Sequence, residues 1–263
     1  MHNIEKRKPS IVYDYLAIRE PTIKKKTCSV LGSTLSGFHQ WIARKKIALH
    51  TLSRDHMTAW FSFLNTRGFH PSTRRYKIMS VRQYLSWLYE KGMIGIPPEE
   101  LIRKGDFPKV PSYLPRPLPP EIDFELQNRL ANSENQLHQG LLLMRKNGVR
   151  ISELMGLGYD CIRTDNNGIH FIKIPLGKLY NERLVPLEEA TVKLIHKIQD
   201  QGPIPRHWLL FNEYGKQPTY YELKKALKES CEGIETQKPI TSHRLRHTFA
   251  RVRSQKGAIC WIA

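Results

Sequence analysis

A proline-rich segment near the middle of the chain most constrains how the chain can fold. Residues 107–120 read FPKVPSYLPRPLPP and contain six prolines. Proline fixes φ and lacks a backbone N–H donor, so this stretch is excluded from a helix interior. We interpret it as a stiff, extended linker. The sequence therefore predicts two domains, at residues 1–106 and 121–263, joined by a linker at residues 107–120.

Positive charge is unevenly divided along the chain. The 263 residues carry a formal net charge of +18. Residues 1–116 hold 21 basic and 8 acidic side chains, whereas residues 117–263 hold 21 and 16. A surplus this large indicates a polyanionic partner, and double-stranded DNA is the first expectation. A basic face that is merely solvated is the alternative.

Several classes of protein are disfavoured by the sequence. No apolar run is long enough to span a bilayer, and no apolar segment follows the charged residues 1–8 as a secretory signal requires. The four cysteines lie far apart without a CxxC pair, which argues against a zinc site or a disulfide framework. We therefore expect a cytoplasmic protein, with no membrane partner, no metal and no cofactor.

The first half of the sequence has apolar residues at helical spacing. Three apolar faces predict three helices: Leu31, Leu35, Phe38 and Ile42; Met57, Trp60, Phe61 and Leu64; and Ile78, Val81, Leu85 and Leu88. Ser53 is expected to cap the second helix, and Ser72 to open the third. Pro97 and Pro98 are expected to start a short fourth helix. A small bundle of about four helices follows.

Basic residues of this half are expected near helix ends and on polar helix faces, where lysine and arginine can reach DNA phosphates. The candidate DNA-binding residues are Lys24, Lys25, Lys26, Arg44, Lys45, Lys46, Arg74, Arg75, Lys77 and Arg82.

The second half has a mixed pattern, so we expect a fold that is mostly α with a small antiparallel β-sheet. Residues 135–146 form an expected helix that Gly148 ends, and residues 169–174 and 183–187 are expected strands joined by a turn. Further helices are expected at 192–198, 222–228 and 243–253. Tyr220 and Tyr221 are expected to pack a helix that begins near them.

Four basic groups in three segments of this half are candidate site residues. They are Arg150 in NGVRISELMGL, Lys178 in IPLGKLYNERLVPL, and His243 and Arg246 in TSHRLRHTFA. Singly, each has an ordinary explanation as a surface, turn, capping or ion-paired residue. The Gly-Lys pair lacks the upstream glycine of a P-loop. Taken together and in this order, the three segments resemble those of the tyrosine recombinase, or phage integrase, family.

The resemblance covers nearly the whole chain and implies both a fold and an activity. It implies a SAM-like helical core-binding domain followed by an integrase-type mixed α/β catalytic domain. Arg150 and Arg246 are implied to clamp the phosphorane transition state through bidentate donors. His243 is implied to assist at the phosphate or the nucleophile. Lys178 is implied to protonate the leaving 5′ oxygen as a general acid.

Two neighbouring residues have implied supporting roles. Glu153, one turn after Arg150, is implied to orient that arginine, and an exposed helix-surface carboxylate is the alternative. His247 is expected to be structural or supporting rather than catalytic. No metal is implied, because the arginines neutralise the charge on the phosphate.

The resemblance fails at the nucleophile. The family attacks with a tyrosine downstream of the second arginine, whereas the last tyrosine here is Tyr221, upstream of His243. We expect a reading frame or fragment truncated before the tyrosine segment. A whole enzyme would cut and rejoin DNA through a 3′-phosphotyrosyl bond in a synapse of four protomers, in a bacterial or phage setting, and an integrase-type transposase is one such enzyme. A non-catalytic DNA-binding remnant is the alternative, and a basic RNA-binding protein is a distant third.

Overall fold

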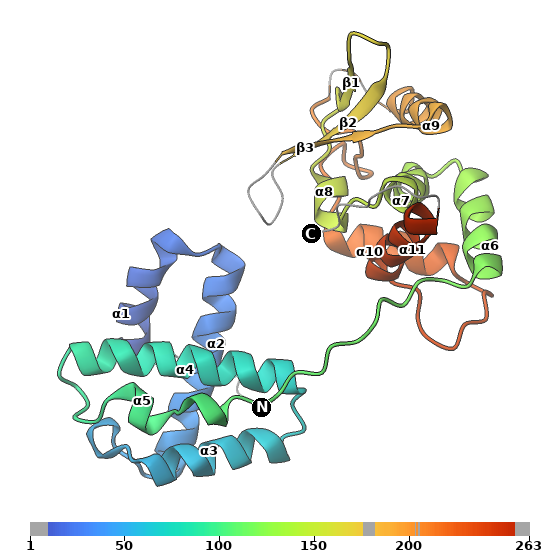
Figure 1. Cartoon of the computed structure of the whole chain (residues 1–263). Helices are drawn as coiled ribbons and strands as arrows, with labels where there is room; N and C mark the ends of the chain where they lie inside the picture. Colours follow the sequence, from blue (N-terminus) through green and yellow to red (C-terminus); the bar gives the residue numbers. More distant parts are fainter. Residues whose placement is uncertain (1–9, 176–181, 203, 205, 256–263) are drawn as a thin grey trace, which may run out of the picture. The chain divides into compact units, whose positions relative to one another are not determined.

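A computed structural model describes residues 10–175, 182–202, 204 and 206–255. The chain divides into two compact units, Met1–Tyr113 and Leu114–Ala263, and each is described by itself (Figure 1). Within the described residues, no helix has both the length and the apolar character needed to cross a bilayer.

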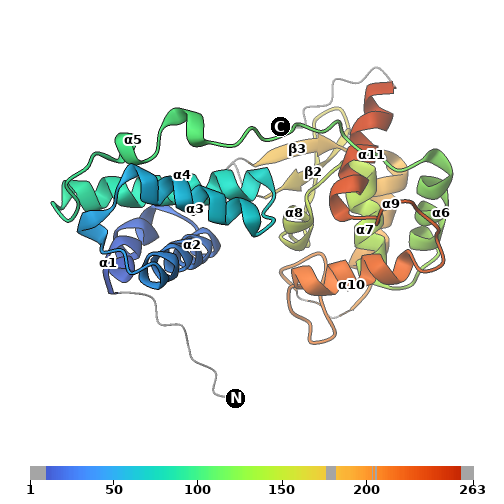
Figure 2. The same ribbon diagram turned by 90° about the horizontal axis from the view of Figure 1, so that it is seen from below.

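The first unit is built from helices. They are α1 (Ser10–Arg19), α2 (Lys25–Arg44), α3 (Arg54–Thr66), α4 (Pro71–Glu90) and α5 (Pro98–Leu101), with short 3-10 turns η1 (Glu20–Thr22), η2 (Leu49–Thr51) and η3 (Lys104–Asp106). Helix α4 packs against α2, α3 and α5, and α1 packs against α2 (Figures 1 and 2). The four expected helices are present. Helix α1 was not expected from the sequence, because its ten residues show little helical periodicity of apolar side chains and bury only three of them.

Local capping signals in this unit are partly as expected. Ser53 caps α3: its hydroxyl accepts the backbone N–H of His56, whose ring accepts the N–H of Ser53 in return. The expectation that Ser72 opens the next helix is wrong. Helix α4 begins at Pro71, and the Nδ1 atom of His70 accepts the N–H of Ser72. Proline fits this first helical position because its missing donor would be unpaired there in any case.

The second unit combines helices with a small sheet. Its elements are α6 (Pro120–Ala131), α7 (Gln136–Asn147), α8 (Ile151–Met155), β1 (Ile162–Thr164), β2 (His170–Ile174), β3 (Arg183–Pro186), α9 (Glu189–Gln199), α10 (Tyr220–Ser230) and α11 (Ser242–Gln255). Helix α7 lies at the centre and packs against α6, α8, α9, α10 and α11 (Figure 1). Its buried leucines therefore form the middle of the core.

The three strands form one antiparallel sheet in the order β1-β2-β3. In the β2–β3 ladder Ile172 lies opposite Val185 and Ile174 opposite Arg183. Ile172 and Ile174 are fully buried and join the same core cluster as Ile195 of α9. The expected fold class, mostly α with a small antiparallel sheet, is confirmed. Strand β1 was not expected, because three residues are too few to show alternation.

The proline-rich segment has no helix or strand from residue 107 to 119, and Pro120 is the first residue of α6. Its last residues nevertheless belong to the second unit. Leu118 is buried in the core, and its N–H donates to the Thr248 hydroxyl on α11 at 2.8 Å. The guanidinium of Arg244, also on α11, donates to the carbonyls of Arg116 at 3.3 Å and Pro117 at 3.4 Å. The end of the segment is therefore anchored on α11.

Candidate active site

A glycine turn between α7 and α8 brings the two candidate arginine segments together. Gly148 ends α7 in the left-handed conformation, with φ of 63°, and Arg150 follows immediately before α8. The Arg246 guanidinium of α11 donates to the Gly148 carbonyl at 2.8 Å. Phe249, one turn further along α11, lies so close to Gly148 that a Cβ atom would overlap its ring. The two arginines are thus carried by segments that meet at this turn.

Glu153 is buried beneath the turn and is held by two arginines. Its carboxylate accepts the Arg150 backbone N–H at 2.7 Å and the Arg150 Nη1 at 2.8 Å. It also accepts Nη1 and Nη2 of Arg183, on β3, at 3.0 and 2.8 Å. Burial favours the neutral acid, but the hydrogen bonds from Arg183 and Arg150 outweigh it and lower the pKa of Glu153 to about 2. The alternative of an exposed surface carboxylate is wrong, since Glu153 is 2% exposed.

The two histidines of the last segment lie on one side of α11. The hydroxyl of Thr241 accepts the Arg244 N–H at the start of this helix. His243, in the first turn, is exposed, whereas His247 is half-buried, and their rings meet edge to face at 4.6 Å. Burial lowers the pKa of His247, and the neighbouring His243 and Arg246 lower it further. His247 is therefore neutral at neutral pH and packs beside His243.

Lys178 lies outside the described residues, which stop at residue 175 and resume at residue 182. The strands on either side of it, β2 and β3, are described and paired. Lys173 on β2 and Glu182, just before β3, form an ion pair of 3.1 Å near the end of the β2–β3 ladder.

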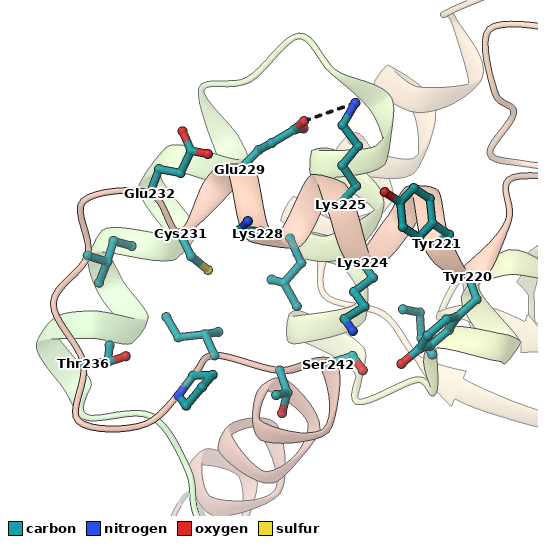
Figure 3. A pocket seen from close by; sticks show the side chains of 16 residues that line it. Tyr220, Tyr221, Lys224, Lys225, Lys228, Glu229, Cys231, Glu232, Thr236 and Ser242 are labelled. Atoms are coloured by element: carbon teal, nitrogen blue, oxygen red, sulfur yellow. Dashed lines mark ion pairs between the residues drawn. The ribbon is translucent and has the colours of Figure 1, made fainter. Parts of the chain in front are cut away.

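A pocket borders the site between α10 and the segment that leads into α11 (Figure 3). Ile151, next to Arg150, and Ser242, next to His243, both line it, which places the starts of α8 and α11 around one hollow. The α10 side chains that line it include Tyr220, Tyr221, Lys224, Lys225 and Lys228.

The pocket corrects one expectation and adds residues that the sequence pattern did not single out. The two tyrosines begin α10 but do not pack it, since Tyr220 is 54% and Tyr221 73% exposed. The lysines of α10 were not among the candidates. Their spacing, two adjacent and one a turn later on the same helix, is the signal that indicates a basic face. Arg183 was also missed, although it lies five residues after Lys178 in the segment that carried the resemblance.

The ten candidate basic residues of the first unit fall into three groups. Residues 24–26, around the start of α2, and residues 44–46, at its end, are all exposed. On α4, Arg75 is exposed, whereas Arg74, Lys77 and Arg82 are half-buried.

The basic residues of α4 are partly engaged by the protein itself. Arg74 donates to Asn65, the Arg75 guanidinium lies 5.6 Å from the Phe107 ring centre, and the Lys77 amine lies 5.0 Å from that of Phe69. Burial lowers the pKa of Lys77. Arg75 and Arg82 line a common groove with Lys104. Residues 24–26 and 44–46, at the two ends of α2, are therefore more accessible than the basic residues of α4.

Within the described part of the chain, no three His, Cys, Asp or Glu side chains gather as metal ligands do.

Comparisons with known proteins give the family of the second unit. A model of the phage integrase family matches residues 124–258, just over half of the chain. Transposase B from transposon PsiTn554 of Staphylococcus aureus is 29% identical over 153 residues, which cover 58% of this chain and 24% of the transposase. The chain thus spans about a quarter of that relative. Tyrosine recombinase XerC of Roseiflexus castenholzii is 27% identical over 244 residues, covering 88% of this chain and 75% of the recombinase.

Solved structures share the fold across both units. A lambda integrase dimer bound to a COC′ core site has a TM-score of 0.74 at 13% identity, covering 95% of this chain and 90% of the integrase chain. The Tn1549 transposon integrase in complex with circular intermediate DNA has a TM-score of 0.68 at 15% identity, covering 94% and 87%. At such identities the likeness establishes the fold.

Proposed function

Because the chain belongs to the phage integrase family of tyrosine recombinases, we propose that it acts in site-specific DNA recombination, as a DNA strand transferase of the integrase or transposase type. The observation that carries the proposal is the meeting of two arginine segments at one turn, where Arg246 bonds the carbonyl of Gly148, two residues before Arg150. Two guanidiniums held this way can offer paired donors to the same phosphate. The buried carboxylate of Glu153 fixes one of them.

We propose these roles for the site residues. Arg150 and Arg246 bind the non-bridging oxygens of the DNA phosphate and stabilise the charge that develops there. His243 donates to a phosphate oxygen or moves the proton of the nucleophile. Lys178 gives the proton to the leaving 5′ oxygen. Glu153 orients Arg150, and the neutral ring of His247 supports His243. No step in this scheme requires a metal.

We propose that residues 1–106 form a core-binding domain, residues 107–120 the linker, and residues 121–263 the catalytic domain. Duplex DNA is the proposed partner of both domains, together with other protomers in a tetrameric synapse. The exposed basic residues at both ends of α2 support the first assignment. The lysines of α10 support the second, because they line the pocket (Figure 3) that Ile151 places beside the turn from Gly148 to Arg150, here called the arginine turn.

Residues 222–263, which include the whole segment after Arg246, contain no tyrosine. We propose that these 263 residues supply the phosphate-binding and acid groups, and that a tyrosine from outside them completes the reaction. The same observation favours a second candidate function, a DNA-binding protein that performs no cleavage.

DNA binding tests the proposal. For a fluorescent duplex, we expect affinity to fall by roughly 10³-fold between 50 and 200 mM salt, because phosphate contacts release counterions. Changing Lys24, Lys25 and Lys26 together to Gln should reduce the slope of log affinity against log salt by about 0.9 for each phosphate that is no longer neutralised. The matched control changes Lys193 and Lys197 of α9 to Gln and should leave the slope unchanged. An affinity that is independent of salt would contradict phosphate binding.

A nicked suicide duplex separates the two candidate functions. We expect no covalent protein–DNA adduct from residues 1–263, and an adduct would overturn our account of the nucleophile. Appending the tyrosine segment of the XerC relative after residue 263 should then give an adduct that Arg246→Ala abolishes. Intact DNA binding without an adduct in that fusion would favour the non-cleaving protein.

A further inference from the structure

Arg183 is a residue of the site to which the proposed chemistry assigns no role. It begins β3, the strand that follows the segment containing Lys178. Both of its terminal nitrogens donate to the Glu153 carboxylate, at 3.0 and 2.8 Å. The Glu153 side chain is 1% exposed, whereas that of Arg183 is 34% exposed. A half-exposed arginine thus reaches inward to bind a buried acid across 30 residues of sequence.

Arg183 determines the net charge of the cluster that it forms with Glu153 and Arg150. Glu153 accepts the Arg150 guanidinium at 2.8 Å, and a carboxylate at that distance cancels the positive charge that a phosphate would meet. Arg150 and Glu153 alone sum to zero, whereas the addition of Arg183 restores a net charge of +1. Removing Arg183 alone would therefore leave a neutral Arg150–Glu153 pair, whereas removing Arg183 and Glu153 together would again leave the single positive charge of Arg150.

The position of Arg183 also ties two elements together. In the β2–β3 ladder it lies opposite Ile174, the last residue of β2, so the two residues form the last pair of the ladder before the chain leaves β2. Its bonds to Glu153 connect this end of the ladder to α8, at whose start Arg150 lies. One bidentate contact therefore links the strand after the candidate acid to the turn of the first candidate arginine.

We propose that Arg183 is a positioning residue with two effects: it balances the charge of Glu153, so that Arg150 keeps its positive charge toward a phosphate, and it connects the start of β3 to α8. The proposal rests on the proposed function, since it assumes that Arg150 meets a phosphate. Arg183 acts through Glu153 and touches no reacting atom.

Binding of inorganic phosphate to the full chain, measured by calorimetric titration, tests the proposal with a charge-balanced variant. We expect Arg183→Gln to weaken phosphate binding by about tenfold, because Glu153 then cancels Arg150. The double variant Glu153→Gln with Arg183→Gln should recover to within about threefold of the parent, because the cluster again sums to +1. Arg183→Lys, which keeps the charge and loses the paired donors, should lie between them.

Two further variants set the limits of this experiment. Arg163→Gln is the matched control: Arg163 lies on β1 and pairs with the exposed Asp160 at 3.1 Å, away from Glu153, and its loss should leave binding unchanged. Arg150→Ala gives the phosphate affinity that remains without the first candidate arginine. If that variant binds phosphate as well as the parent, the proposed function fails at this site. If it binds poorly but the double variant is no better than Arg183→Gln, the positioning proposal alone is overturned.

The pH dependence of unfolding gives a second readout that a mere packing role would not move. The charged groups facing Glu153 are Arg150 and Arg183, and they hold its pKa at about 2. The stability they provide is complete above about pH 4.5 and is lost as the pH falls towards about 2. The destabilisation by Arg183→Gln should therefore shrink by about half between pH 6 and pH 3. A destabilisation that is constant over this range would mean that Arg183 only packs.

Discussion

The buried ionisable side chains of the described residues include Asp123, Glu153 and His39. Asp123 accepts two hydrogen bonds from the buried Arg145, both at 2.6 Å, and Glu153 accepts four from its two arginines. His39 has a neutral partner, the Tyr84 hydroxyl, 2.9 Å from its Nε2 atom. Because a buried charge needs a counter-charge, Glu153 stays ionised beside its arginines, whereas His39 beside a hydroxyl stays neutral.

The burial of His39 makes the first unit sensitive to mild acid. Burial lowers the pKa of His39 from 6.5 to about 4. Below pH 6.5 His39 becomes protonated in the unfolded chain, whereas in the folded chain it stays neutral until about pH 4. The free energy of unfolding therefore decreases as the pH is lowered across this range. We expect a loss of about 2 kcal/mol between pH 7 and pH 5, measured by urea unfolding followed through tryptophan fluorescence.

The control for this experiment is His39→Gln, which keeps a polar partner for Tyr84 but cannot titrate. Its stability should change much less over the same pH range. Were the parent and His39→Gln to lose the same stability between pH 7 and pH 5, the titration of His39 would not be the cause.

At the scale of elements, the contact between α7 and α11 organises the candidate site. Gly148 lets α7 end in a left-handed turn, and the absence of a side chain lets Phe249 pack directly against that turn. The same approach allows Arg246 to reach the Gly148 carbonyl. One glycine therefore satisfies a backbone requirement and a packing requirement at once.

Gly148→Ala should disturb both requirements. We expect a loss of about 2–4 kcal/mol in the free energy of unfolding, from the left-handed backbone and from the overlap with Phe249. Gly168→Ala is the matched control, because Gly168 also has a positive φ, of 78°, but nothing lies within 4 Å of the added Cβ. Its loss should be about 1 kcal/mol, from the backbone alone. Equal losses in chemical denaturation would mean that the packing of Phe249 on this turn contributes nothing.

At the scale of the whole molecule, the connection between the two units is shorter than the proline-rich segment. Residues 116–118 are bonded to Arg244 and Thr248 of α11, the helix that carries His243 and Arg246. Upstream of this anchor, Tyr113 is 62% and Leu114 87% exposed. Residues 116–118 are therefore held on the helix that bears two of the candidate site residues.

Limited proteolysis locates the end of this anchor. With subtilisin, we expect the first cuts between residues 109 and 114 and none between 116 and 118, because hydrogen-bonded backbone resists cleavage. Arg244→Ala should extend the cuts into residues 116–118, as mass spectrometry of the fragments would show. Arg251→Ala, an exposed position on the same helix, is the matched control. An unchanged pattern in Arg244→Ala would show that this arginine does not hold the linker.

The elements that the sequence predicted are those with strong local signals, such as the cap at Ser53 and the helix end at Gly148. Helix α6 was missed because its buried face consists of Asp123, Leu126 and Leu130. Asp123 occupies a position where an apolar residue would have completed the helical spacing. Its burial is explained by its ion pair with Arg145 on α7, which the sequence pattern does not show. Helix α8 and strand β1 are too short to show a period.

The sequence by itself determined the family resemblance, the order of the three basic segments and the fold class, because these depend on residue types and on short-range spacing. Only the tertiary structure decided that Glu153 is buried and that Arg183 is its partner. That pair spans 30 residues and joins a strand to a helix. Ion pairs of this kind form where folding brings two elements together, and they leave no periodic trace in either segment.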